Sequence, residues 1–157
     1  MRFGILSDTH GQTELVKKAV TIFERAEIQE FIHCGDVGTK EIVSLLAKFP
    51  GHYVLGNTDT SSLKSWVTEF RQTYYGNVGI ISREGRRIAF LHGDDWRTFD
   101  DLLYRQHFDL ICYGHEHQFS WRIENETRIL NPGGFTRTTP SVVTLDLPQL
   151  SIQKYVL

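Results

Sequence analysis

Five short apolar segments of the chain end in residues that commonly bind metal ions. Each segment is followed by Asp, Asn or His, in the order "SDTH" after Phe3–Leu6, "GD" after Phe31–Cys34, "GN" after Tyr53–Leu55, "HGD" after Ile88–Leu91 and "GHEH" after Leu110–Tyr113. Taken singly, each group could be a turn, because Gly, Asn and Asp are frequent where a chain leaves a strand. Their repetition at the ends of successive strands predicts one shared site, since ligand crevices of α/β sheets lie beyond the carboxyl ends of strands.

The residue types at these strand ends suit two metal ions better than one. The candidate ligands are two carboxylates, one amide oxygen and four imidazoles: Asp8, His10, Asp36, Asn57, His92, His115 and His117. These are too many for one tetrahedral ion, but they suit two ions that share a bridging ligand, for which Asp36 is the natural candidate. Mixed nitrogen and oxygen ligands favour transition metals over Mg or Ca, but they do not select among Mn, Fe, Ni, Zn and Co. We expect Mn.

Such a centre predicts phosphoester hydrolysis. Two divalent ions would carry more positive charge than Asp8 and Asp36 neutralise, so the centre would attract a phosphate group. Two ions about 3.5–4 Å apart lower the pKa of a bridging water and hold the attacking and leaving oxygens in line. We expect Asp36, Asn57 and His92 to be catalytic residues and the reaction to proceed by attack of a metal-bridged hydroxide.

The first part of the chain predicts alternating strands and helices. Helices are expected near Thr13–Ala26 and Lys40–Lys48, between the apolar segments that begin at Phe3, Phe31 and Tyr53. Apolar residues recur in the first helix at the spacing of one helical face. A βαβαβ order implies a parallel sheet.

The second part of the chain predicts hairpins. A loop or short helix is expected around Ser61–Glu69 and a helix near Phe99–Gln106, with hairpin turns at Glu84–Gly85, Asn125–Glu126 and Pro148–Gln149. We therefore expect a largely antiparallel second half. The combined prediction is an α/β (α+β) fold, a four-layer αββα sandwich of two mixed β-sheets, in a single domain spanning residues 1–157.

Composition narrows the class of protein. The chain has 157 residues, a formal net charge of −2 and 40% hydrophobic residues, values typical of a globular domain with one core. The small net charge makes a nucleic acid polymer an unexpected partner. No apolar stretch approaches the roughly 20 residues of a membrane span and no signal peptide is recognised, so we expect a cytoplasmic protein without a membrane partner. Cys34 and Cys112 lie in apolar runs and are predicted to be buried free thiols.

The ordered motifs resemble the calcineurin-like metallophosphoesterase superfamily, whose pattern is D-x-H, G-D, G-N-H-[DE], a later His and G-H-x-H. The resemblance covers nearly the whole chain and implies the αββα fold. It also implies one metal held by Asp8, His10, Asp36 and His117, and a second held by Asp36, Asn57, His92 and His115. Small bacterial and archaeal phosphodiesterases of this superfamily are the most similar branch. Some members of that branch associate as dimers, which implies a homodimer here.

One position departs from the superfamily pattern. Thr58 stands where many superfamily phosphatases have a His that assists the leaving group, and Thr has no group that titrates near neutral pH. We therefore expect hydrolysis of a small phosphodiester with a good leaving group rather than strong phosphomonoesterase activity. Thr58, Asp59 and Arg137 are candidate substrate-binding residues; Asp59 is also a candidate for supporting the site from behind.

Two other functions compete with this interpretation. A catalytically weak or inactive member of the fold could serve as a scaffold that binds a protein partner, and the loss of the His at position 58 fits that alternative too. The presence of the expected residue type at every ligand position argues for the enzyme. A nuclease acting on double-stranded DNA is disfavoured by the net charge.

Overall fold

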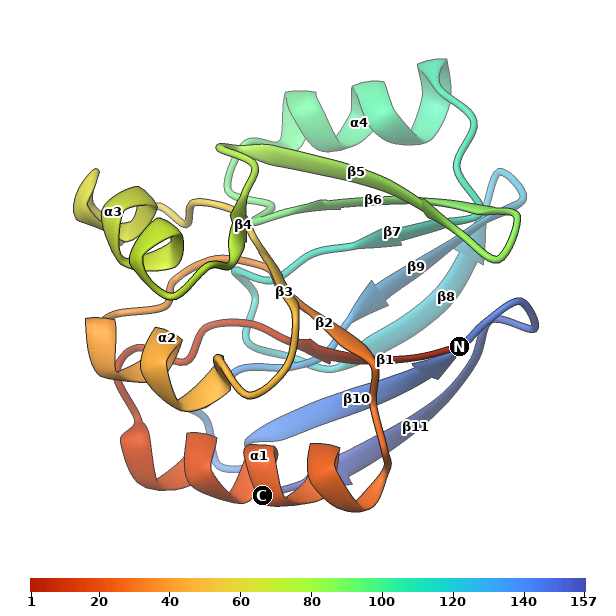
Figure 1. The fold of residues 1–157 in the computed structure, drawn as a ribbon. Helices are drawn as coiled ribbons and strands as arrows, with labels where there is room; N and C mark the ends of the chain where they lie inside the picture. The colour runs from red at the N-terminus through yellow and green to blue at the C-terminus, as the bar shows by residue number, and fades with distance from the viewer.

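The computed structural model describes residues 1–157 and contains two mixed β-sheets that pack face to face (Figure 1). The first sheet contains β1 Arg2–Leu6, β2 Glu30–His33, β3 Gly51–Tyr53, β4 Thr73–Tyr74, β10 Ser141–Asp146 and β11 Ser151–Val156. Its strand order is β11-β10-β1-β2-β3-β4. The second sheet contains β5 Val78–Arg83, β6 Arg86–Leu91, β7 Leu110–Cys112, β8 Ser120–Glu124 and β9 Thr127–Asn131, in the order β5-β6-β7-β9-β8.

Four helices cover the outer faces of the two sheets. Helices α1 Thr13–Arg25, α2 Lys40–Leu46 and α3 Ser62–Glu69 lie against the first sheet, and α4 Trp96–Arg105 lies against the second (Figure 1). Three buried apolar clusters fill the interfaces between the layers: one beneath α1 to α3, one between the sheets and one beneath α4. The predicted four-layer αββα sandwich is therefore confirmed.

The pairing of the strands agrees with the predicted parallel first half and with a mainly antiparallel second half. In the first sheet β1, β2 and β3 are parallel, as the βαβαβ order predicted. The largely antiparallel second half that was expected is found in β5–β6, β8–β9 and β10–β11, whereas β6, β7 and β9 are parallel to one another. The antiparallel pairs β5–β6 and β8–β9 join neighbours across tight turns, which the sequence reveals. Strands β6 and β7 flank α4, so the βαβ rule applied to the first half also implies their parallel pairing. No local signal marks the pairing of β7 with β9.

Some element boundaries also differ from the prediction. Strand β3 ends at Tyr53 instead of beginning there, and the unpredicted β4 lies at the edge beside it. Helix α4 begins at Trp96, earlier than expected, because the side chain of Asp95 accepts a hydrogen bond from the Arg97 N–H and caps it. Neither change moves a candidate ligand away from the end of its strand.

The two cysteines lie in the core between the sheets, as predicted. Cys34 and Cys112 are both fully buried and unpaired, and burial raises the pKa of both thiols. An apolar environment disfavours the thiolate, so neither residue is a candidate nucleophile. None of the helices is long and apolar enough to cross a lipid bilayer.

Candidate metal centre

The five strand ends meet at one edge of the sandwich. Strands β1, β2 and β3 are parallel in one sheet and β6 and β7 are parallel in the other, so the loops that follow them open in the same region (Figure 1). The parallel pairing of β6 with β7 is essential here, because an antiparallel partner would carry His92 and His115 to opposite ends of the sheet.

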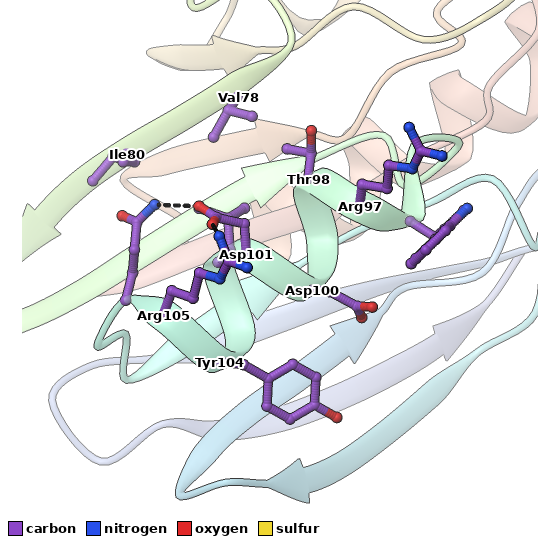
Figure 2. A pocket seen from close by; sticks show the side chains of 11 residues that line it. Val78, Ile80, Arg97, Thr98, Asp100, Asp101, Tyr104 and Arg105 are labelled. Atoms are coloured by element: carbon purple, nitrogen blue, oxygen red, sulfur yellow. Dashed lines mark hydrogen bonds and ion pairs between the residues drawn. The ribbon is translucent and has the colours of Figure 1, made fainter.

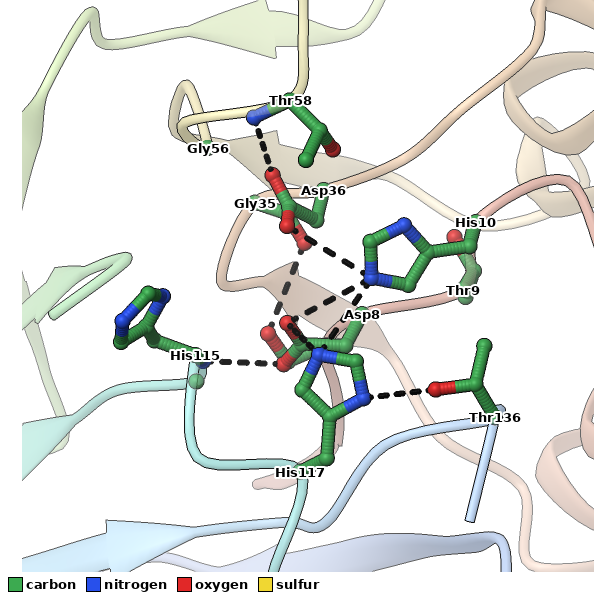
Figure 3. Close-up of polar contacts among 12 residues, drawn as sticks. Asp8, Thr9, His10, Gly35, Asp36, Gly56, Thr58, His115, His117 and Thr136 are labelled. Atoms are coloured by element: carbon green, nitrogen blue, oxygen red, sulfur yellow. Dashed lines mark hydrogen bonds and ion pairs between the residues drawn. The ribbon is translucent and has the colours of Figure 1, made fainter. Parts of the chain in front are cut away.

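Asp8, His10 and His117 form the first group of candidate ligands (Figure 3). His117 Nε2 lies 3.1 Å from Asp8 Oδ1 and 3.4 Å from His10 Nε2. His10 Nε2 lies 3.9 Å from Asp8 Oδ1 and 3.5 Å from Asp36 Oδ2. Asp8 Oδ1 is buried without a hydrogen-bond partner. A buried carboxylate oxygen is normally satisfied, so this atom fits a ligand position.

Asp36, Asn57, His92 and His115 form the second group. His92 Nε2 lies 3.4 Å from Asp36 Oδ2 and 2.8 Å from Asn57 Oδ1. His115 Nδ1 lies 3.2 Å from the same amide oxygen. The His92 ring is oriented by the backbone, because its Nδ1 lies 2.9 Å from the carbonyl oxygen of Cys34, on the side of the ring away from Asp36 and Asn57. A backbone carbonyl on the far ring nitrogen is the usual way in which a metal-binding His is held.

Asp36 Oδ2 lies close to His rings of both groups, and Asp8 lies within reach of both as well. Asp36 Oδ2 lies between His10 Nε2 at 3.5 Å and His92 Nε2 at 3.4 Å, and the other carboxylate oxygen accepts a hydrogen bond from the Thr58 N–H. One oxygen thus faces both groups while the other is fixed to the backbone. This arrangement, together with the unpartnered Asp8 oxygen, fits carboxylates that would hold divalent cations.

The charges of the site are unevenly distributed. Burial alone raises the pKa of Asp36, but hydrogen bonds from His92 and the Thr58 N–H outweigh it and lower that pKa below its usual range. Burial opposes charging of His92, yet Asp36 and the Cys34 carbonyl raise its pKa to about 9. Burial also raises the pKa of Asp8. Positive charge beside Asp36 is therefore favourable, and a divalent cation would supply it in place of the His92 proton.

The backbone at the site adopts an unusual conformation. Five of the candidate ligands have positive φ angles: Asp8 (55°), His10 (43°), Asp36 (56°), His115 (66°) and His117 (55°). Residues other than Gly rarely adopt this region, and such strain is typically found at functional sites. The surrounding structure must therefore hold these loops in place.

Two glycines allow the loops to approach closely. A Cβ atom on Gly56 would lie 2.1 Å from Asp36 Oδ1, and one on Gly114 would lie 1.9 Å from Ser7 Oγ and 2.6 Å from Asp8 Oδ2. No side chain fits at either position. Glycine is therefore required where these two loops approach the carboxylates of Asp8 and Asp36.

Asp59 occupies a different position from that expected of a substrate ligand. Its carboxylate accepts hydrogen bonds from the backbone N–H groups of Asp36, Val37, Gly38 and Gly56. All of these donors belong to the loops after β2 and β3. The Asp59 side chain therefore holds two loops of the site together, as expected of a residue that supports the ligands without touching substrate. With four N–H donors bound, its carboxylate has no free acceptor for substrate.

Two supporting residues were missed in the sequence. Thr136 Oγ1 lies 2.7 Å from His117 Nδ1 and orients that ring from the loop before β10 (Figure 3). His33 Nε2 lies 2.9 Å from Thr9 Oγ1, whose hydroxyl donates to the carbonyl of Val37. The hydroxyl proton is thereby engaged, so the His33 Nε2–H donates to Thr9. Neither residue belongs to a motif, and no sequence signal would have identified them.

The surface around the ligands is hollowed on two sides. A hollow of about 250 Å³ includes Asn57 and His92, and one of about 350 Å³ includes His117 and Arg137. The largest hollow, about 880 Å³, lies elsewhere, between β5 and α4, and contains none of the candidate ligands (Figure 2). The structure thus brings Arg137 to the rim of the predicted site.

Fold and site together define an α/β sandwich with a candidate two-metal centre where both sheets end. Residues 1–149 match the calcineurin-like phosphoesterase superfamily domain, and the chain belongs to that superfamily. It is 25% identical to "Phosphodiesterase MJ0936" of Methanocaldococcus jannaschii, over 100% of this chain and 99% of that protein. It is 27% identical to a "Probable metallophosphoesterase" of Methanothermobacter thermautotrophicus, over 92% of this chain and 85% of the relative. A solved archaeal phosphodiesterase superposes with a TM-score of 0.91 at 22% identity, each chain being covered completely, which shows the shared fold.

Proposed function

We propose that residues 1–157 form one phosphodiesterase domain that hydrolyses a small phosphodiester with two divalent transition-metal ions, Mn first among them. The observation that carries this proposal is the position of Asp36 Oδ2 between His10 and His92. Asp8, His10, Asp36 and His117 would hold one ion, and Asp36, Asn57, His92 and His115 the other. The ions would supply Lewis acidity and a nucleophilic water at neutral pH.

The protein's own residues contribute position and charge. Thr58 fixes Asp36 through its backbone N–H, and the Cys34 carbonyl and Thr136 fix the rings of His92 and His117. Thr58 offers no acid for the leaving oxygen. We therefore propose a preference for diesters with good leaving groups. A homodimer and a cytoplasmic location stay predictions.

An assay with matched aryl substrates tests the proposal. The Mn-loaded protein should hydrolyse bis(4-nitrophenyl) phosphate faster than 4-nitrophenyl phosphate, and Asp36→Asn should reduce that activity by at least about a hundredfold. Thermal unfolding of the variant in chelator controls for misfolding. Preference for the monoester would contradict the diesterase proposal, and metal binding without hydrolysis of any diester would favour the scaffold function.

A further inference from the structure

A positively charged hollow adjoins the candidate metal centre on the His117 side. Its volume is about 350 Å³, and its lining includes His117, Phe119, Arg137, Thr138, Thr139 and Lys154. None of its lining residues is an Asp or Glu, and neither Arg137 nor Lys154 makes an ion pair within 4.0 Å. We call this the cationic hollow. It therefore offers two unpaired cations and two hydroxyl groups next to a candidate metal ligand.

Lys154 is held in place by packing. It lies on the edge strand β11, two residues after Ile152, which packs into the core between the sheets. Alternate residues of a strand share a face, so Lys154 extends from the same side toward the second sheet. Its Nζ lies 4.6 Å from the ring centroid of Phe119, a partly buried residue of that core. This cation–π contact positions the ammonium group beside the hollow that Lys154 lines.

A second hollow, which adjoins Asn57 and His92, has the opposite charge. It includes Asn57 and His92 and contains Asp59, Asp94 and Asp95 but no Lys or Arg. A negatively charged substituent would be repelled there and attracted by Arg137 and Lys154. A phosphodiester has two arms, so this difference in charge gives the bound substrate a preferred direction.

We propose that the cationic hollow binds a second anionic group, a carboxylate or phosphate, carried by one arm of the phosphodiester substrate. This inference rests on the proposed function, since the scissile phosphate must lie at the metal centre. Arg137 and Lys154 are then specificity residues: they bind an anion of the substrate, while the candidate ligands act on the phosphodiester. The substrate class narrows to asymmetric diesters with an anionic arm, and the other arm is neutral or cationic.

A pair of diaryl phosphates tests the proposal. One is 4-nitrophenyl 4-carboxyphenyl phosphate, and the other is the isosteric 4-carbamoylphenyl diester, which lacks the extra charge. Chromatography measures both released phenols, so hydrolysis is detected whichever arm leaves. The Mn-loaded protein should prefer the carboxylate diester by about tenfold in kcat/KM, the ratio typical of one charge-assisted hydrogen bond. The preference should shrink as salt rises from about 50 to 500 mM, because the cations are exposed.

Variants assign the preference to the hollow. Lys154→Met and Arg137→Met should each reduce the ratio of the two kcat/KM values several-fold, and Lys154→Glu should reverse it. The matched control is Lys18→Glu, which makes the same change in net charge at an exposed position on α1. Unfolding temperatures identify any variant that fails to fold. If Lys154→Glu does not fold, the proposal is tested with Lys154→Met and Arg137→Met.

The possible failures are distinguishable. Hydrolysis of both diesters at equal kcat/KM, with a ratio that no variant moves, would overturn this inference and leave the phosphodiesterase proposal standing. If neither diester is hydrolysed, the phosphodiesterase proposal fails. Calorimetric titration of both diesters into the Mn-loaded protein then decides the inference: tighter binding of the carboxylate diester that Lys154→Glu abolishes supports the hollow, and equal binding refutes it.

Discussion

Asp59 holds two loops of the candidate site together, and its replacement gives a sharp prediction. Its Oδ2 accepts hydrogen bonds from the Asp36 N–H at 2.8 Å and the Gly56 N–H at 3.0 Å. Its Oδ1 accepts from the Val37 N–H at 2.9 Å and the Gly38 N–H at 3.3 Å. Asp59→Asn keeps the size of the side chain but leaves one acceptor oxygen. The amide NH₂ must then face one pair of N–H donors, and the Val37–Gly38 pair is the weaker of the two.

The loss can be estimated from these contacts. A hydrogen bond to a charged group contributes about 1.5–3 kcal/mol, so two of them correspond to roughly 3–6 kcal/mol. Burial raises the pKa of Asp59, although the N–H groups of Gly56 and Gly38 oppose that shift. Desolvation of the carboxylate therefore offsets part of its hydrogen-bond energy, and we take the lower end of the range of roughly 3–6 kcal/mol. We expect Asp59→Asn to reduce the free energy of unfolding by about 3 kcal/mol and the Tm by roughly 10 °C.

Urea unfolding in the presence of a chelator measures this loss without any contribution from bound metal. Asp95→Asn is the matched control, because it makes the same chemical change at an exposed helix cap where Asn is an equally good residue. A loss below about 1 kcal/mol relative to that control would refute the role assigned to Asp59. Calorimetry adds a second readout, since displacement of the Asp36 loop should weaken Mn binding to the folded variant.

Three further predictions address the glycine contact, the bound metal and a buried histidine. Gly56→Ala places a methyl group 2.1 Å from Asp36 Oδ1, so it should weaken Mn binding at least tenfold, measured by calorimetry; binding equal to wild type would contradict the close approach. Mn at about 100 times its Kd should raise the free energy of unfolding by about 2.7 kcal/mol per site, and the gain should vanish in Asp36→Asn. Burial lowers the pKa of His33 to about 3, against 6.5 for the ordinary residue. Between about pH 3 and 6.5 this histidine is protonated in the unfolded chain but neutral in the folded protein, so the free energy of unfolding falls as pH falls. From pH 6.5 to 4.5, wild type in chelator should lose about 2 kcal/mol more than His33→Gln; equal losses would refute this.

The strand ends were predictable because their signal is local. Each apolar run and the polar residues after it are adjacent in sequence, so Asp8, Asp36 and His92 could be placed at strand ends by reading the chain alone. The turns at Glu84–Gly85 and Asn125–Glu126 were predictable for the same reason, since both pairs adopt the positive φ angles of tight hairpins.

The parallel pairing of β7 with β9 was not predictable, because β8 lies between them in the chain and no pairing signal links the two strands. Thr136 and His33 were missed because their roles depend on contacts with residues far away in the chain. The function of Asp59 was ambiguous for a related reason. Its sequence neighbours suggested a substrate contact, and only the fold brought the Val37 and Gly38 N–H groups to it.

The sequence by itself determined which residue types stand at the strand ends, and therefore the chemistry they suit and the superfamily they indicate. The tertiary structure decided their arrangement: Asp36 Oδ2 lies between His10 and His92, and hollows of opposite charge adjoin His92 and His117. The reason is physical. The identity of a ligand is fixed by its own side chain, whereas a bridge or a charged hollow exists only when segments distant in the chain pack within a few ångströms of each other.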